Sequence, residues 1–258
     1  FDFEWINANL FSNRYTRTGS FWQNSEELSA LGRPADEIEK KLLAPYMDRV
    51  QPDVMDGTYE PTKTDGSGRD RAILREALKK FGEAGYSIED GKLVKDDQQL
   101  SFEIMTSNQD EEKMALAYQR TASALGIDVA VRTVDDAQFQ KRRQTWDYDM
   151  TAAQLSASLS PGAEQVWRWD TRSRDVEGTF NYAGAADPAI DAMIDAMLNA
   201  RERDEFAAAV RALDTTWTQR SDAVRARAAE QTWDGAAGAL QAVLERALAR
   251  HRRRRGRG

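Results

Sequence analysis

Apolar and polar residues alternate in three segments near the middle of the chain. The first segment has apolar side chains at every second position, at Leu100, Phe102 and Ile104. The same period of two continues through residues 127–131, and residues 148–155 resemble it. Because successive side chains of a strand point to opposite faces, this spacing predicts three strands.

Two helices are predicted between these strands. One begins at a cap formed by Asn108 or Asp110 and ends at Gly126, a residue that tolerates the left-handed conformation. The other begins at Asp135 or Asp136 and continues to residue 146. Helices that connect strands favour parallel strand pairs joined by right-handed crossovers. The pattern therefore predicts an α/β fold, with a mixed sheet flanked by helices.

A polar loop follows the third predicted strand, and its sequence is Ser156-Ala-Ser-Leu-Ser-Pro-Gly-Ala-Glu-Gln165. Open α/β sheets bind ligands at the carboxyl ends of their strands, where such loops lie. The loop is rich in groups that form hydrogen bonds and poor in groups that catalyse reactions. We interpret it as a binding loop.

The remaining periodicity predicts mainly helices. Further helices are expected at 1–9, 34–46, 69–84, 187–198 and 203–213. In the helix at 187–198 the expected inward residues are Ile190, Met193, Ile194, Met197 and Leu198. Asp90-Gly91 predicts a two-residue hairpin turn, and residues 51–68 predict a loop. Gly66-Ser-Gly-Arg-Asp70 could be a phosphate-binding turn, but it lacks the Lys-Ser/Thr ending, so a turn that leads into a helix is the better interpretation.

Aromatic residues are dense in the first 31 positions and alternate with amides and hydroxyls. Ring faces beside polar groups can grip an extended peptide or a sugar. The same composition also fits the edge of a core with capped turns. Composition leaves both interpretations open.

Composition excludes several kinds of chemistry. The chain has 258 residues with no Cys and a single His, His251, which lies inside an arginine-rich segment. This leaves no disulfide, thiolate metal site, cysteine nucleophile or Ser-His-Asp triad. Paired carboxylates are expected by chance among 43 acidic residues and carry little information. No apolar run is long enough to span a membrane. The sequence does not start with a signal-sequence pattern, and its first residue is Phe instead of Met, so we favour a fragment of a longer protein.

Charge is distributed unevenly along the chain. Residues 1–212 are acidic, whereas residues 213–258 are rich in Ala and Arg and have helical spacing. We therefore divide the chain into a first domain at 1–212 and a helical extension at 213–258 with a basic, disordered end. The arginine run after residue 250 could bind nucleic acid in a salt-dependent way, but a solvated run is the simpler interpretation.

Several ordered blocks resemble one protein family. They are Phe1-Asp-Phe-Glu-Trp5, Tyr15-Thr-Arg-Thr-Gly-Ser-Phe21, Gln23-Asn-Ser25, Thr64-Asp-Gly-Ser-Gly-Arg69, Arg132-Thr-Val-Asp-Asp-Ala-Gln138, Ser158-Leu-Ser-Pro-Gly162, Asn181-Tyr-Ala-Gly184 and Asp187-Pro-Ala-Ile-Asp191. Together they resemble the carboxyl-side half of family 5 extracytoplasmic solute-binding proteins, in the branch of ABC importers for oligopeptides and microcin C. The resemblance implies one lobe of a two-lobe periplasmic protein that closes over a peptide.

By position in the resemblance, two sets of residues would face or support the ligand. They are Tyr15, Arg17, Ser20, Phe21, Trp22, Asn24 and Ser25, and then Ser156, Ser158, Ser160, Glu164, Gln165 and Asn181. Relatives that bind free peptides often place an aspartate in the second set for the ligand amino group. Here serines stand in the loop, and Glu164 is the nearest acid.

The resemblance also implies partners and a compartment. We expect a monomeric protein of the periplasm that hands a peptide to the membrane subunits of an ABC importer. No catalytic residue, metal or cofactor is expected, nor nucleic acid or a membrane span. One alternative is an enzyme, because residues 227–248 faintly resemble the terminal helix of two-lobed sugar-nucleotide glycosyltransferases, as a fusion or remnant would.

Overall fold

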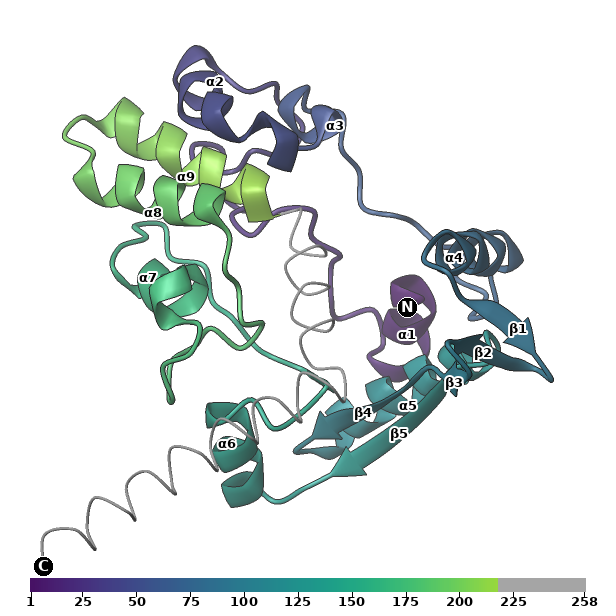
Figure 1. The fold of residues 1–258 in the computed structure, drawn as a ribbon. Coiled ribbons are helices and arrows are strands. Elements are labelled where there is room, and N and C mark those ends of the chain that lie inside the picture. The colour runs from purple at the N-terminus through teal and green to yellow at the C-terminus, as the bar shows by residue number, and fades with distance from the viewer. Residues whose placement is uncertain (218–258) are drawn as a thin grey trace, which may run out of the picture. The chain divides into compact units, whose positions relative to one another are not determined.

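A computed structural model describes residues 1–217 of the chain (Figure 1). These residues form two compact units. The first contains residues 1–23, 59–158 and 177–182, and the second contains 24–58, 159–176 and the part that begins at 183. The predicted arginine tail and most of the predicted extension lie outside the described residues.

A three-stranded parallel sheet organises the first unit. Its order is β5 (Asp128–Thr133), β4 (Ser101–Thr106), β6 (Met150–Thr151), so that β4 is central. Ile104 faces Val131 on one side and Met150 on the other. The parallel pairing confirms the prediction, but β6 is much shorter than the predicted strand at 148–155. Just before β6, a side chain takes the place of strand pairing: the Asp149 carboxylate accepts the backbone N–H of Glu103 in β4 at 2.8 Å.

Helices cover both faces of this sheet. Helix α5 (Gln109–Ser123) begins at Asn108 and α6 (Asp136–Gln144) begins at Asp135, and each cap accepts backbone N–H groups. Both starts confirm the predicted caps. Ile104 packs with the apolar side of α5, whereas its neighbour Met105 packs with Phe139 of α6. Strand β4 is therefore buried on both faces, as central strands of parallel sheets are.

An antiparallel sheet lies in the same unit. It contains β1 (Ser87–Glu89), β2 (Lys92–Lys95) and β3 (Gln98–Gln99), joined in sequence order. Asp90 and Gly91 have φ of 48° and 78°, the signature of a type I′ hairpin turn, which confirms the predicted hairpin. The α/β class is confirmed, with parallel and antiparallel pairs divided between two sheets.

Helices α1 (Phe3–Leu10) and α4 (Arg71–Glu83) complete the first unit. Apolar side chains of α4 pack against the cluster beneath the sheets. Asp70 caps α4 by accepting from Ala72 and Ile73, so the segment at 66–70 is a turn that leads into a helix. The Asp2 carboxylate caps α1 and also accepts the Gly68 N–H at 2.8 Å.

The second unit is helical in its described part. Its elements are α2 (Glu37–Leu43), the 3-10 helix η1 (Ala44–Arg49), α3 (Pro52–Met55), α7 (Glu164–Trp169), the 3-10 helix η2 (Thr171–Ser173), α8 (Pro188–Asn199) and α9 (Arg203–Trp217). The prediction of a loop at 51–68 was wrong at its start, because Pro52 begins the short helix α3. The first position of a helix suits the fixed φ of proline.

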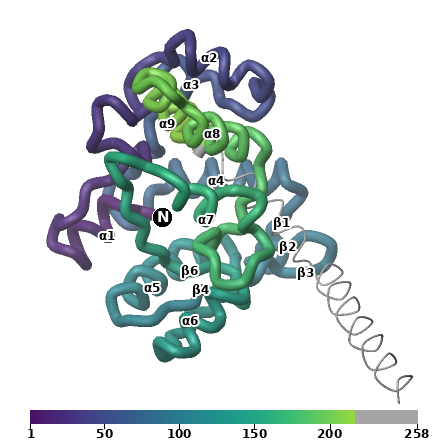
Figure 2. Tube along the Cα trace, turned by 90° about the vertical axis from the view of Figure 1, so that its left-hand side faces the viewer, coloured from purple at the N-terminus to yellow at the C-terminus, as the bar shows by residue number. Residues whose placement is uncertain are grey.

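Helices α8 and α9 lie side by side in Figures 1 and 2. Ile190, Met193, Ile194 and Met197 of α8 are buried, as predicted. Leu198 was predicted to point inward as well, but it is 42% exposed. It directly follows Met197, and one residue turns a helix by about 100°. That rotation carries its side chain off the buried stripe.

Ion pairs between side chains connect α2 and its N-cap to α9. The Arg211 guanidinium lies 3.1 Å from the Glu39 carboxylate and 2.6 Å from that of Asp36. Burial raises the pKa of Glu39, against the opposing effect of its hydrogen bond from the Asp36 N–H and of the Arg211 charge. Helix α9 continues through the predicted domain boundary at 212–213. Whether 213–258 forms a separate extension stays a prediction.

Candidate ligand-binding site

Helix α1 holds the backbone of Tyr15. The Asn7 side chain, which is buried, donates its amide to the Tyr15 carbonyl at 2.7 Å and accepts the Tyr15 N–H at 3.0 Å. The Tyr15 ring contacts the edge of Phe11, with centroids 5.1 Å apart, yet stays 57% exposed. Asn7 therefore orients a predicted ligand residue while leaving its ring open to solvent.

A tight turn at residues 19–23 carries further predicted contacts. The Gln23 side chain accepts the Gly19 N–H at 2.7 Å, and the Ser20 hydroxyl accepts the Trp22 N–H at 3.1 Å. Phe21 is half-buried and packs edge-on against Trp22. These bonds turn a segment without regular secondary structure into a defined surface.

Trp22 links this turn to the predicted binding loop. Its ring is 3% exposed, and its indole N–H donates to the Ser158 carbonyl at 3.0 Å. Ser158 and Ser156 have exposed side chains, and Arg17 is half-buried. The structure thus brings two segments of the predicted site together within the first unit, with Trp22 packed between them.

A second turn of this unit contains Asn181, whose side chain is fully buried. The Trp146 indole donates to the Asn181 carbonyl at 2.9 Å, and the Tyr148 hydroxyl donates to the Tyr182 carbonyl at 2.8 Å. Arg143 stacks over the Tyr182 ring at 4.6 Å. Trp146 has φ of 52°, a left-handed conformation that is rare for a bulky residue. The α6–β6 connection therefore holds this turn at the expense of local backbone strain.

The other predicted contacts belong to the second unit. Asn24 and Ser160 are exposed, and the Ser25 hydroxyl accepts the Leu28 N–H at 3.2 Å. Gln165 is fully buried: its amide nitrogen donates to Glu164, and its oxygen accepts the Trp169 indole N–H at 3.0 Å. Those bonds hold helix α7 together.

Glu164 already has several donors. Both of its carboxylate oxygens lie 3.0 Å from the Gly162 nitrogen, and one lies 3.0 Å from the Gln165 amide. Burial acts to raise the pKa of Glu164, but these hydrogen bonds outweigh burial and leave it lowered. The carboxylate is therefore negative and firmly held at the start of α7. Its pairing with a ligand amino group stays a prediction, as do all the proposed contacts.

Sequence reasoning missed the side chains that hold these segments, namely Asn7, Trp146 and Tyr148. Asn7 lies on a helix face, and nothing in its neighbours marks it as a clamp. Their bonds join residues 8 to 35 positions apart, which a local pattern cannot reveal. Only the fold brings them into contact.

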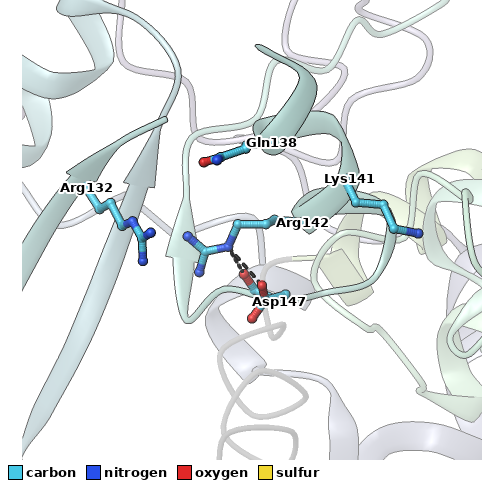
Figure 3. Close-up of a pocket in the computed structure, with 5 residues that line it drawn as sticks. All are labelled: Arg132, Gln138, Lys141, Arg142 and Asp147. Carbon is cyan, nitrogen blue, oxygen red and sulfur yellow. Dashed lines mark hydrogen bonds and ion pairs between the residues drawn. The ribbon is translucent and has the colours of Figure 1, made fainter. Parts of the chain in front are cut away.

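Sequence reasoning also missed a pocket of about 400 Å³ in the first unit (Figure 3). Its lining residues are Arg132, Gln138, Lys141, Arg142 and Asp147. Arg132 comes from β5, and the others come from α6 and the turn after it. The block from Arg132 to Gln138 was part of the family resemblance, and that signal could have pointed here.

The cations of this pocket have carboxylate partners of their own. Arg142 donates to Asp147 at 3.0 Å and to Glu103 at 2.8 Å, as the dashed lines to Asp147 in Figure 3 mark in part. Lys141 pairs with Glu177 at 2.8 Å, and Arg132 lies 3.7 Å from Glu103. Each cation that lines the pocket is therefore paired with a carboxylate.

Comparison with known proteins decides the family. A sequence model of the bacterial extracellular solute-binding proteins, family 5, matches residues 1–176 of the chain. The chain belongs to this family. Within residues 1–217, no helix has both the length and the apolar character needed to cross a membrane. Nor does that part of the chain contain a group of three His, Cys, Asp or Glu residues suited to a metal ion.

Named relatives agree with this assignment. The family 5 chain is 56% identical over 215 residues to a putative binding protein of Brucella melitensis. It is 49% identical to the peptidoglycan-binding protein YepA and 35% identical to the probable peptide-binding protein YejA, both of Agrobacterium fabrum. Each match covers 83% of this chain and 35% of the relative. The chain thus spans about a third of their length.

Solved structures show the same fold at low sequence identity. The oligopeptide-binding protein AppA of Bacillus subtilis, in complex with a nonapeptide, matches 75% of this chain and 38% of its own, with a TM-score of 0.51 and 17% identity. The periplasmic binding protein DppA of Helicobacter pylori, in complex with the peptide STSA, matches 77% and 36%, with a TM-score of 0.50 and 15% identity.

Proposed function

We propose that this chain is the substrate-binding part of an ABC importer that captures oligopeptides or peptide-like solutes. The observation that carries the proposal is the family 5 match over residues 1–176. The peptide class is supported by a relative named as a probable peptide-binding protein at 35% identity. The protein would work in the periplasm as a monomer and deliver its ligand to the importer's membrane subunits.

The first unit offers groups that suit an extended peptide. The exposed ring of Tyr15 supplies apolar contact, and Asn7 holds the backbone of Tyr15 in place. The polar loop residues at 156–158 supply hydroxyl and backbone groups that can bind peptide amides. Backbone recognition of this kind gives affinity without strict sequence preference, because every residue of a ligand offers the same N–H and C=O groups.

Capture without chemistry fits the residue inventory. The chain has no Cys, and its single His lies in the arginine-rich end. We therefore propose a binding protein that leaves its ligand unchanged. Incubation with peptides followed by mass spectrometry tests this directly, because any hydrolase activity would produce shorter peptides over time.

The binding test is a thermal-shift scan of the purified chain against di- to hexapeptides. A dose-dependent rise in melting temperature is the expected result, because a ligand that binds only the folded state stabilises it. The full-length Brucella melitensis relative serves as a parallel sample. If neither protein responds to any peptide, the proposal is wrong.

One specific observation favours a second ligand class. The relative named as peptidoglycan-binding is 49% identical to this chain, more than the 35% of the peptide-binding relative. Peptidoglycan fragments contain short peptides with D-residues, so the same scan should include them. A larger stabilisation by D-residue muropeptides than by matched all-L peptides would assign the chain to this class.

A further inference from the structure

The segment from Tyr15 to Gln23 contains neither helix nor strand, yet it is fixed at both ends. At its start, Asn7 binds both backbone groups of Tyr15. At its end, Trp22 donates to the Ser158 carbonyl, 136 positions further along the chain. A segment without ladder bonds needs such partners for its backbone groups. Asn7 of helix α1 is such a partner, whereas Trp22 bonds the loop after β6 through its side-chain indole.

The indole side of the bond to Ser158 is shielded from water. Trp22 is 3% exposed, and the edge-on contact with Phe21, with centroids 4.9 Å apart, covers one side of the indole. A buried N–H that loses its acceptor retains the full desolvation penalty, so this bond is strongly favoured over an open arrangement. The indole therefore defines where the loop backbone lies.

The direction of the indole is itself defined by the turn at 19–23. The Ser20 hydroxyl accepts the Trp22 N–H at 3.1 Å, and the Gln23 side chain accepts the Gly19 N–H at 2.7 Å. Both bonds are local and close the turn from within. The turn thus fixes the direction in which the Trp22 ring points toward the loop.

We propose that Trp22 is a positioning residue, which joins the 15–23 segment and the loop after β6 into one surface through its bond to the Ser158 carbonyl. The family resemblance implied that Trp22 would face or support the ligand, and we assign it the second of these roles. The effect on affinity rests on the proposed peptide-binding function, whereas the mechanical link does not. Preorganised contacts bind more tightly because less freedom is lost on binding.

The test compares Trp22→Phe with Trp5→Phe by hydrogen exchange and by calorimetric titration with the best peptide of the scan. Trp22→Phe removes the indole N–H but keeps an aromatic ring. We expect faster amide exchange in residues 153–158 as well as in 16–23, and a roughly three- to tenfold weaker peptide affinity, the effect of one lost hydrogen bond. Trp5, which packs against Gly68 and Arg120 in the same unit, should change neither result.

A second variant covers the risk that Trp22→Phe fails to fold. Gln23→Ala opens the turn without removing the ring, and it should produce the same two effects at smaller amplitude. Faster exchange confined to residues 16–23 in a folded variant would overturn the link. Linked exchange with unchanged affinity would overturn the positioning role. A wild-type chain that binds no peptide would contradict the proposed function, while the exchange data would still decide whether Trp22 joins the two segments.

Discussion

The two units of this chain form their cores in different ways. In the first unit the continuous stretch from 59 to 158 supplies both sheets and most of the helices. The second unit assembles its helices from three separated stretches of the chain. Neighbouring segments can pack from local patterns alone, whereas distant segments need contacts that select their partners.

The two units also differ in how deeply their ion pairs are buried. In the first unit the Arg142–Glu103 pair keeps about a fifth of each side chain exposed, at 19% and 24%. In the second unit the Arg211–Glu39 pair is almost fully buried, at 7% and 1%. Buried ion pairs add little net stability but strongly disfavour arrangements that leave one charge alone. We infer that the ions of the second unit specify how α2 meets α9.

The largest expected effect is the loss of Arg211. Arg211→Met removes the nearer cation of the buried Glu39 carboxylate and leaves only Arg33, at 3.7 Å. Removal of one partner of a buried pair costs about 3–5 kcal/mol. Urea denaturation followed by circular dichroism measures the change. Arg203→Met is the matched control, because its pair with Glu27 is exposed and should matter little. Equal effects of both substitutions would contradict the special role of the buried pair.

Large-to-small substitutions test whether the units unfold separately. Met105 of β4 and Met193 of α8 are 0% and 1% exposed. Each change to Ala should cost about 2–5 kcal/mol, because a cavity replaces buried apolar atoms. Hydrogen exchange should show the loss in the first unit for Met105→Ala and in the second for Met193→Ala. A uniform loss in both variants would mean that the units unfold as one.

Two glycines of the first unit separate backbone strain from steric clash. Both have left-handed φ, 81° for Gly126 and 78° for Gly91, which costs an L-residue roughly 1–2 kcal/mol. A Cβ at Gly126 would lie 2.7 Å from the Gly91 carbonyl oxygen, whereas one at Gly91 would meet nothing within 4 Å. Gly126→Ala should therefore destabilise more than Gly91→Ala in chemical denaturation. The opposite order would mean that the hairpin backbone near Gly91 moves at little cost to avoid the added Cβ.

The smallest effect concerns pH and Glu39. Its pKa is raised by burial from an ordinary 4.5, so in the pH window just above 4.5 the folded state keeps a proton that the unfolded state has released. The contribution of Glu39 to stability therefore falls as pH rises through that window and is constant above it. The difference in unfolding free energy between wild type and Glu39→Gln, measured from pH 4 to 7, should follow this trend. A difference that grows with pH would contradict the sign.

Much of the first unit could be predicted from the sequence. The period of two at Leu100–Ile104, the cap at Asn108 and the Asp90-Gly91 turn all act over a few residues, and each was confirmed. The predictions that were wrong concern where elements begin or end and where one side chain points. Strand β6 stops at Thr151, where its pairing with β4 ends, and Pro52 begins a short helix in the predicted loop. Leu198 is exposed because one residue turns a helix by about 100°, away from the buried stripe.

The candidate site shows the same division. The sequence alone determined the family, the polar character of the loop at 156–165 and the lack of any cysteine thiolate, since these follow from residue identity and order. Only the tertiary structure decided that Asn7 clamps Tyr15, that Gln165 is buried in α7, and that Trp22 is bonded to Ser158. The physical reason is that a hydrogen bond depends on distance and direction in space, and the chain brings those atoms together only when the whole unit has folded.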